Sequence, residues 1–146
     1  MKFGEGGTRL MSRRRGRVLI VEDEVLLAWM ARETLQEAGY EVVGVATDRP
    51  AAVAAAVTHR PDLVLMDIRL AGGTNGIEAA IEIFSRTGIR SIFVTATGSL
   101  EKRLRAKPAQ PLGWLAKPFD AADLVAIVGT ALADDTPDAP TAEAAD

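Results

Sequence analysis

Short apolar runs alternate with amphipathic stretches from Arg17 to about residue 133. The apolar runs are rich in aliphatic and β-branched residues, as in strands buried on both faces, and they cover 18–21, 42–45, 63–66, 91–94 and 112–116. The stretches between and after them repeat apolar residues with helical spacing and predict helices at 24–38, after Asp48, around 77–84, at 99–107 and after Asp120. This strict alternation predicts an α/β fold with helices on both faces of one parallel sheet.

The first helix is predicted to turn one apolar face toward the sheet, formed by Leu27, Met30, Thr34, Leu35 and Ala38. Trp29 lies off that face, and two interpretations of it stay open. It is either partly buried against a neighbouring element, or it forms an exposed apolar spot with Val25 and Ala28 that faces a partner protein.

Composition narrows the chemistry. The chain has 146 residues, 48% hydrophobic and 25% charged, which suits one globular domain. Cysteine is absent and His59 is the single histidine, so disulfides, thiol nucleophiles and metal sites built from Cys or His are excluded. No uncharged apolar run approaches the roughly 20 residues of a membrane span, and the start carries no apolar signal-peptide core. We therefore expect a cytoplasmic protein without a membrane partner.

Charge is distributed unevenly between the two ends. Residues 1–17 contain six basic residues and one acid, whereas residues 134–146 contain five acids and no base. Neither segment has an apolar period, so we predict a disordered basic arm at 1–16 and a disordered acidic tail at 134–146, around a domain at 17–133. The arginine run at 13–17 has the composition of a nucleic-acid arm, but a solvated flank or an extended start ahead of Met11 is favoured, and no nucleic-acid partner is expected.

Polar side chains gather where the predicted strands end. Glu22-Asp23-Glu24, Asp67, Thr95 and Lys117 each follow a strand, and ligands of parallel sheets bind at the carboxyl ends of strands. Clustered carboxylates repel one another unless a cation lies among them, and oxygen-only ligands favour Mg²⁺. A hydroxyl and an ammonium beside such a cluster suit a tetrahedral oxyanion. The predicted chemistry is phosphoryl transfer, with Asp67 as a candidate nucleophile.

Five motifs occur in an order and spacing that resemble the receiver domain of bacterial response regulators. They are VLIVEDE (18–24), PDLVLMDIRL (61–70), NGIEA (75–79), FVTA (93–96) and GWLAKPF (113–119). The resemblance covers 17–133. It implies a flavodoxin-like (βα)5 fold, a doubly wound parallel sheet with strand order 2-1-3-4-5.

The resemblance also implies roles for single residues. Asp67 corresponds to the aspartate that accepts the phosphoryl group, and Lys117 to the lysine that pairs with a phosphoryl oxygen. Asp23 and Glu22 correspond to the acidic pair that holds Mg²⁺ together with Asp67, and the backbone carbonyl of Arg69 to a further ligand. The Lys117–Pro118 peptide is expected to be cis, as it is in the family.

Two switch residues follow from the same resemblance. Thr95 corresponds to the hydroxyl that moves toward the phosphoryl group, and its spacing to Lys117 supports this position. An alignment shifted by two residues would place Thr97 there instead. Trp114 occupies the place of a smaller aromatic that changes rotamer in the family, and a switching indole and a fixed one are both open interpretations.

The expected function is that of a stand-alone response regulator, not an enzyme with turnover of an external substrate. The phosphoryl group would come from a sensor histidine kinase or a phosphotransfer protein, with Val25, Ala28 and Trp29 as the kinase-facing surface. The signal would pass through the strand at 91–94, the helix at 99–107 and the strand at 112–116 to an unidentified protein target or to a second copy in a phosphorylation-dependent homodimer.

Two rival functions are weaker. A phosphatase of the haloacid-dehalogenase type needs an Asp-x-Asp motif at its nucleophile, and here Asp67-Ile68-Arg69 supplies Arg at the position of the general acid. A pseudo-receiver, or adaptor, would bind proteins without being phosphorylated. The full set of Asp23, Asp67, Thr95 and Lys117 argues against an inactive site.

Overall fold

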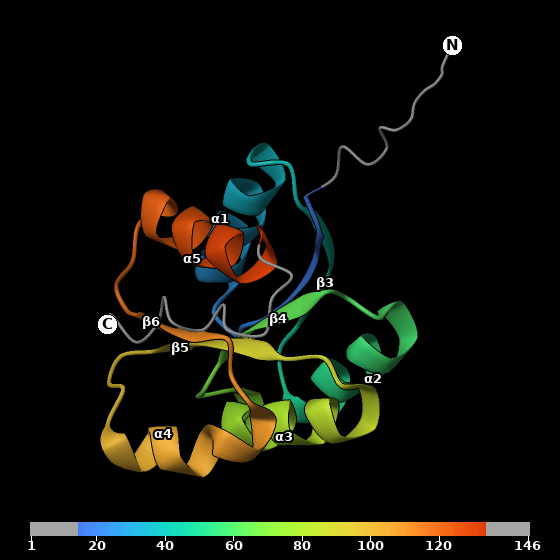
Figure 1. Ribbon diagram of the computed structural model, residues 1–146, viewed down its shortest axis with the longest axis vertical. Coiled ribbons are helices and arrows are strands. Elements are labelled where there is room, and N and C mark those ends of the chain that lie inside the picture. Colours follow the sequence, from blue (N-terminus) through green and yellow to red (C-terminus); the bar gives the residue numbers. More distant parts are fainter. Residues whose placement is uncertain (1–14, 134–146) are drawn as a thin grey trace.

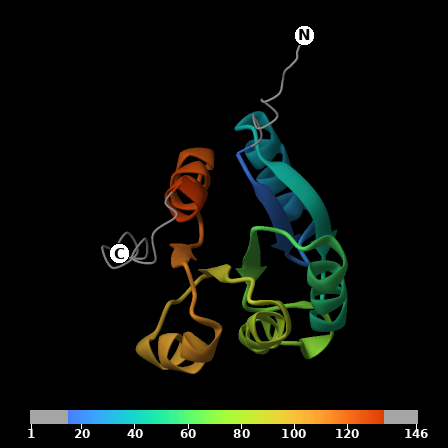
Figure 2. The same cartoon turned by 45° about the vertical axis from the view of Figure 1, so that its right-hand side comes forward.

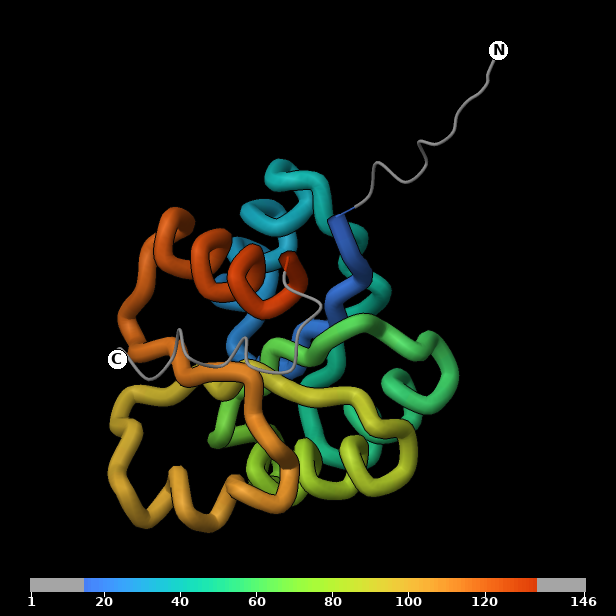
Figure 3. The backbone as a smooth tube through the Cα atoms, in the orientation of Figure 1, coloured from blue at the N-terminus to red at the C-terminus, as the bar shows by residue number. Residues whose placement is uncertain are grey.

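The computed structural model describes residues 15–133, which form a five-stranded parallel sheet covered by helices (Figure 1). The strands are β2 (Arg17–Val21), β3 (Glu41–Ala46), β4 (Leu63–Asp67), β5 (Ser91–Thr95) and β6 (Gly113–Ala116). Their spatial order is β3-β2-β4-β5-β6, which is 2-1-3-4-5 in chain order of these strands. Figure 3 traces how the chain leaves β2 for β3 on one side and returns as β4 on the other. The predicted flavodoxin-like fold is confirmed.

Five α-helices connect or follow these strands in the described part of the chain. They are α1 (Val25–Glu37), α2 (Arg49–His59), α3 (Gly76–Thr87), α4 (Leu100–Ala106) and α5 (Ala121–Ala133), with 3₁₀ turns η1 (Ala71–Gly73) and η2 (Lys107–Ala109). Helices α1 and α5 cover one face of the sheet, while α2, α3 and α4 lie on the other (Figure 1; Figure 2). The predicted caps form, since Asp48 accepts a hydrogen bond from the Ala51 N–H at 2.9 Å and Asp120 from the Asp123 N–H at 2.8 Å.

The core has two layers because successive residues of each strand point to opposite faces. In β4, Val64 and Met66 pack toward α2 and α3, whereas Leu63 and Leu65 pack toward α1 and α5. All five residues of β4 are buried. Burial on both faces explains why the strands read as continuous apolar runs instead of alternating ones.

The predicted inward face of α1 is buried only in part, at Leu35, and its other four residues are partly buried. The buried residues of this helix are Ala28, Ala31 and Leu35, whereas Leu27 and Met30 are only partly buried. Alanine side chains allow the helix to lie close to the sheet, so small residues form the contact. Ala28, predicted to face a kinase, is therefore part of the core.

The folded part begins at least two residues earlier than predicted. The Arg15 N–H donates to the Gly39 carbonyl at 3.2 Å, the Arg15 guanidinium lies 5.5 Å from the centre of the Tyr40 ring, and the Gly16 carbonyl accepts from the Glu41 N–H at 2.8 Å. The rest of the predicted basic arm and the acidic tail lie outside the described residues. Within those residues, no helix has both the length and the apolar character of a membrane span.

Candidate functional site

The carboxyl ends of four strands bring the predicted polar residues to one cavity of about 550 Å³. Asp67 and Thr95 are the last residues of β4 and β5, and both are buried. Asp23 follows β2, Lys117 follows β6, and these four side chains all line the cavity. The parallel register therefore assembles the site from positions that are 22 to 94 residues apart in the chain.

Three carboxylates form the acidic half of this site. Glu22, Asp23 and Asp67 each present an oxygen, and these oxygens lie within 4.8 Å of one another. Glu22 and Asp67 are only 6% and 5% exposed, while Asp23 faces solvent. Carboxylate oxygens are hard donors that suit Mg²⁺, which is usually held through one or two carboxylates and keeps several water ligands. The residues present therefore suit the expected cation.

Lys117 provides the positive charge opposite these acids. Its ammonium lies 3.2 Å from Asp67 Oδ2 and 3.6 Å from Glu22 Oε1. Burial lowers the pKa of Lys117, but the charges of Asp67 and Glu22 outweigh it and hold the pKa above its usual value. Lys117 is thus charged at neutral pH. The Lys117–Pro118 peptide is cis, as the resemblance implies.

Glu22 is the carboxyl group most affected by its surroundings. Burial raises the pKa of Glu22 from 4.5 to about 7, and the neighbouring Asp67 charge adds to the rise. The Glu24 N–H, which donates to Glu22 Oε2 at 3.1 Å, and the charge of Lys117 act in the opposite direction. Without a metal ion, Glu22 therefore holds a proton at a pH where an ordinary glutamate is ionised.

We expect the metal-free protein to lose stability between pH 4.5 and pH 7 more steeply than a Glu22→Gln variant. The folded state binds the Glu22 proton more tightly than the unfolded state, so this contribution is present in full below pH 4.5 and is lost as the pH rises through about 7. Urea unfolding in a chelating buffer over this range measures the effect. Parallel stability profiles for the two proteins would show that Glu22 does not titrate as described.

Arg69, in the loop that follows β4, and Gly76, the first residue of α3, support Asp67. The Arg69 N–H lies 3.4 Å from Asp67 Oδ1, and Arg69 lines the cavity. The role of its carbonyl as a metal ligand stays a prediction.

Gly76, which the sequence analysis did not single out, donates its N–H to the Ile68 carbonyl at 2.7 Å. It packs so closely on the Asp67 backbone that a Cβ atom at this position would overlap the Asp67 carbonyl oxygen. Its place directly after the capping Asn75 of α3 was the available signal.

The two candidate switch hydroxyls differ in position. Thr95 is buried at the end of β5, whereas Thr97 lies in the exposed loop before α4. Thr95 Oγ1 donates to the Thr97 carbonyl at 3.0 Å and accepts from the Thr97 N–H at 3.3 Å. Lys102, also absent from the sequence analysis, places its ammonium 2.9 Å from Thr97 Oγ1 and 3.4 Å from Thr95 Oγ1. The switch role of Thr95 stays a prediction.

Trp114 is half-buried between two side chains. Its ring lies 4.8 Å from the Phe93 ring, with the ring planes at 30°, and the Arg103 guanidinium lies 4.9 Å from the centre of the Trp114 ring. Both contacts favour the observed position of the indole, and a switching role for Trp114 stays a prediction. A change of rotamer would have to break the contact with Arg103 of α4.

An exposed apolar patch lies on the first turns of α1, directly after the acidic cluster. Val25, Leu26 and Trp29 expose 80%, 81% and 61% of their surface. Val25 and Trp29, which were predicted as kinase-facing, are exposed together with Leu26, which was not part of that prediction. Ala28 is buried, so its assignment to an exposed surface is wrong. The patch is the exposed side of the same helix whose alanines pack on the sheet.

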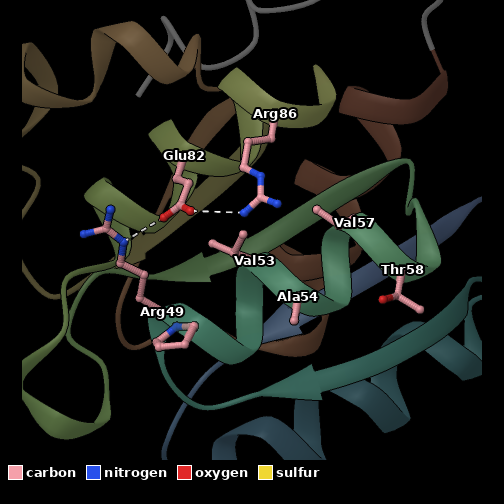
Figure 4. A pocket seen from close by; sticks show the side chains of 8 residues that line it. Arg49, Val53, Ala54, Val57, Thr58, Glu82 and Arg86 are labelled. Atoms are coloured by element: carbon pink, nitrogen blue, oxygen red, sulfur yellow. Dashed lines mark hydrogen bonds and ion pairs between the residues drawn. The ribbon is translucent and has the colours of Figure 1, made fainter.

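A second cavity, of about 570 Å³, lies between α2 and α3 (Figure 4). Val53 and Val57 of α2 face it, and Glu82 of α3 pairs with Arg49 at 3.0 Å and with Arg86 at 3.3 Å. Arg49 also pairs with Glu78 at 3.1 Å, so the two arginines are matched by two glutamates. None of the three clustered carboxylates lines this cavity. The chemistry therefore belongs to the cavity at the strand ends.

Comparison with known protein families matches residues 18–129 to the response regulator receiver domain. The chain is 40% identical over 116 residues to the transcriptional regulatory protein PdtaR of Mycobacterium tuberculosis, covering 80% of this chain and 56% of PdtaR. It is 36% identical over 110 residues to the chemotaxis protein CheY of Thermotoga maritima, covering 75% of this chain and 91% of CheY. The chain thus spans about half the length of PdtaR and of the phyllosphere-induced regulator PhyR of Methylorubrum extorquens, and most of CheY.

Solved structures agree with this match. The signal receiver domain of a modulated diguanylate cyclase from Desulfovibrio desulfuricans is 38% identical, with a TM-score of 0.73 over 81% of this chain and 94% of that one. A CheY-like receiver domain protein from Methanospirillum hungatei is 29% identical, with a TM-score of 0.73. The match covers 80% of this chain and 93% of that one. The fold, the acidic cluster and the sequence match together place the chain in the response regulator receiver family of two-component signal transduction.

Proposed function

We propose that Asp67 accepts a phosphoryl group from a phosphohistidine on a sensor histidine kinase or a phosphotransfer protein. The observation that carries this proposal is the environment of Asp67, a buried carboxylate at a strand end that contacts Lys117 and lies beside Glu22 and Asp23. In the transfer, the P–N bond of the donor breaks and a P–O bond to an Asp67 oxygen forms. The imidazole leaves with the bonding electron pair.

The neighbouring side chains suit the charge that this reaction brings. A phosphoryl group adds between one and two negative charges at neutral pH. Lys117 is close enough to Asp67 to contact a phosphoryl oxygen, and Thr95 lines the same cavity with a hydroxyl donor. Mg²⁺ held by Glu22, Asp23, Asp67 and the Arg69 carbonyl would neutralise part of the charge. The proposed product is a stoichiometric acyl phosphate, so we do not class the protein as an enzyme.

The partner surfaces in this proposal lie on α1 and α4. The exposed patch of Val25, Leu26 and Trp29 stands beside the acidic cluster and is suited to docking a kinase. Leu100 and Leu104 are 72% and 55% exposed on α4 and one helical turn apart, which suits a downstream protein or a second copy of the chain. That the protein acts as a stand-alone receiver stays a prediction. The cytoplasmic location and the lack of a nucleic-acid partner stay predictions.

Incubation with acetyl phosphate tests the proposal, followed by incubation with a phosphorylated histidine kinase. We expect the intact mass to increase by one phosphoryl group in the presence of Mg²⁺ and not in a chelating buffer. The group should be labile to base, as acyl phosphates are. No uptake from either donor with Mg²⁺ present would favour the adaptor function, in which the protein binds partners without being phosphorylated.

A further inference from the structure

Lys102, in the first turn of α4, presents a second ammonium group to the cavity at the strand ends. Its contacts are all with neutral oxygens: 2.9 Å to Thr97 Oγ1, 3.1 Å to the Thr97 carbonyl and 3.4 Å to Thr95 Oγ1. Among the described residues it forms no ion pair with a carboxylate, unlike Lys117, which contacts two. Lys102 is thus a charged group whose charge is not matched by its described neighbours.

The position of Lys102 relates it to Asp67. Both residues line the same cavity, which Thr95 and Lys117 also line. Lysine carries a compact charge on a flexible four-carbon chain and is a common ligand of phosphate. An anion formed on Asp67 would therefore arise in a cavity that already contains a lysine free to change partners.

We propose that Lys102 is a second phosphoryl-binding lysine, which leaves Thr97 and contacts a phosphoryl oxygen when Asp67 is phosphorylated. The inference rests on the proposed function and deepens it. Hydrogen bonds between two charged groups are stronger than those between an ammonium and a neutral oxygen, so the exchange of partners is favourable. Its consequence is that phosphorylation pulls directly on the start of α4.

The same exchange would release Thr95. The Thr95 hydroxyl is now fully used, because it donates to the Thr97 carbonyl and accepts from both the Thr97 N–H and Lys102. Departure of Lys102 removes one of these bonds, and the hydroxyl becomes freer to turn toward the phosphoryl group.

The start of α4 is connected closely enough to transmit the movement. Ser99 Oγ accepts from the Lys102 N–H at 3.2 Å, and the next residue, Arg103, stacks on Trp114 and donates to the Gly98 carbonyl at 3.3 Å. A displacement of Lys102 would therefore change the contact that holds Trp114.

Beryllium trifluoride becomes a tetrahedral phosphoryl mimic when an aspartate oxygen binds its beryllium atom. It tests this role in a Lys102→Met variant, which keeps most of the apolar chain and removes the charge. At saturating Mg²⁺ we expect the affinity for the anion to fall about tenfold, the loss of one charge-assisted hydrogen bond. The affinity for Mg²⁺ alone should stay the same or increase, because a cation has been removed from the cavity. Lys107→Met is the matched control, since Lys107 is exposed at the end of the same helix, and it should change neither affinity.

An affinity of Lys102→Met for beryllium trifluoride that is unchanged or increased would overturn the proposal. If Lys102 only held the two threonines, Lys102→Met would bind beryllium trifluoride as tightly as the wild type or more tightly. A variant in which both affinities fall together would indicate a structural role instead. Failure of the proposed function gives a different result, because the wild-type protein itself would then bind no beryllium trifluoride and take up no phosphoryl group.

Discussion

Replacing Asp67 by Asn is expected to abolish uptake of the phosphoryl group. The amide has the size of the carboxylate but no anionic oxygen to attack phosphorus, so no acyl phosphate can form. The variant should remain folded, because repulsion among the three clustered carboxylates decreases when one becomes neutral. Lys117 also keeps its ion pair with Glu22, in which the ammonium lies 3.6 Å from Oε1. Intact mass spectrometry after incubation with acetyl phosphate and Mg²⁺ measures the loss.

Asp62→Asn is the matched control for this substitution. Asp62 is an exposed aspartate whose Oδ2 accepts from the Arg17 N–H at 2.8 Å, and an asparagine oxygen can accept the same bond. It should be phosphorylated like the wild type. Equal uptake by Asp67→Asn and the wild type would mean that another residue is the acceptor.

The largest loss of stability is expected from Gly76→Ala. The added methyl group would overlap the Asp67 carbonyl oxygen and lie 2.9 Å from Ile68 Cα, and backbone atoms at the end of a buried strand cannot move aside. Overpacking against backbone should reduce the free energy of unfolding by about 3 kcal/mol. Because the overlapped carbonyl belongs to the acceptor residue, phosphorylation should also slow.

Gly44→Ala provides the comparison for urea unfolding. A Cβ atom there would lie 3.8 Å from the Leu19 side chain, an ordinary contact, and the expected change is below about 1 kcal/mol. If Gly76→Ala proved as stable as Gly44→Ala, the close approach of α3 to the end of β4 would not exist in solution.

The fold was predictable because both faces of the sheet are buried. Continuous apolar runs such as 63–66 indicate such strands. The capping residues Asp48 and Asp120 indicate where helices begin, and Gly88 indicates where one ends. The acidic cluster was predictable for a related reason. Parallel strands all end at the same edge, so residues that directly follow the strands must converge.

The missed residues depend on contacts that the pattern of apolar and polar positions does not encode. Ala28 was not predicted to be buried because larger apolar neighbours dominate the pattern. Small residues nevertheless form part of the contact when a helix packs closely on a sheet. Lys102 belongs to a short charged helix, where a lysine usually points to solvent. Its contacts with Thr95 and Thr97 arise from the turn of the chain before α4. The position of Gly76 after Asn75 signals the start of a helix but not the contact of Gly76 with the Asp67 backbone.

The central claim is most directly tested by locating the phosphoryl group in the wild-type protein. Borohydride reduces an aspartyl phosphate to homoserine and leaves free carboxylates unchanged, so tandem mass spectrometry of the reduced protein identifies the modified position. After incubation with acetyl phosphate and Mg²⁺, we predict homoserine in place of Asp67 and aspartate at every other aspartate position. Homoserine in place of Asp23 or another aspartate, with Asp67 unchanged, would contradict the account.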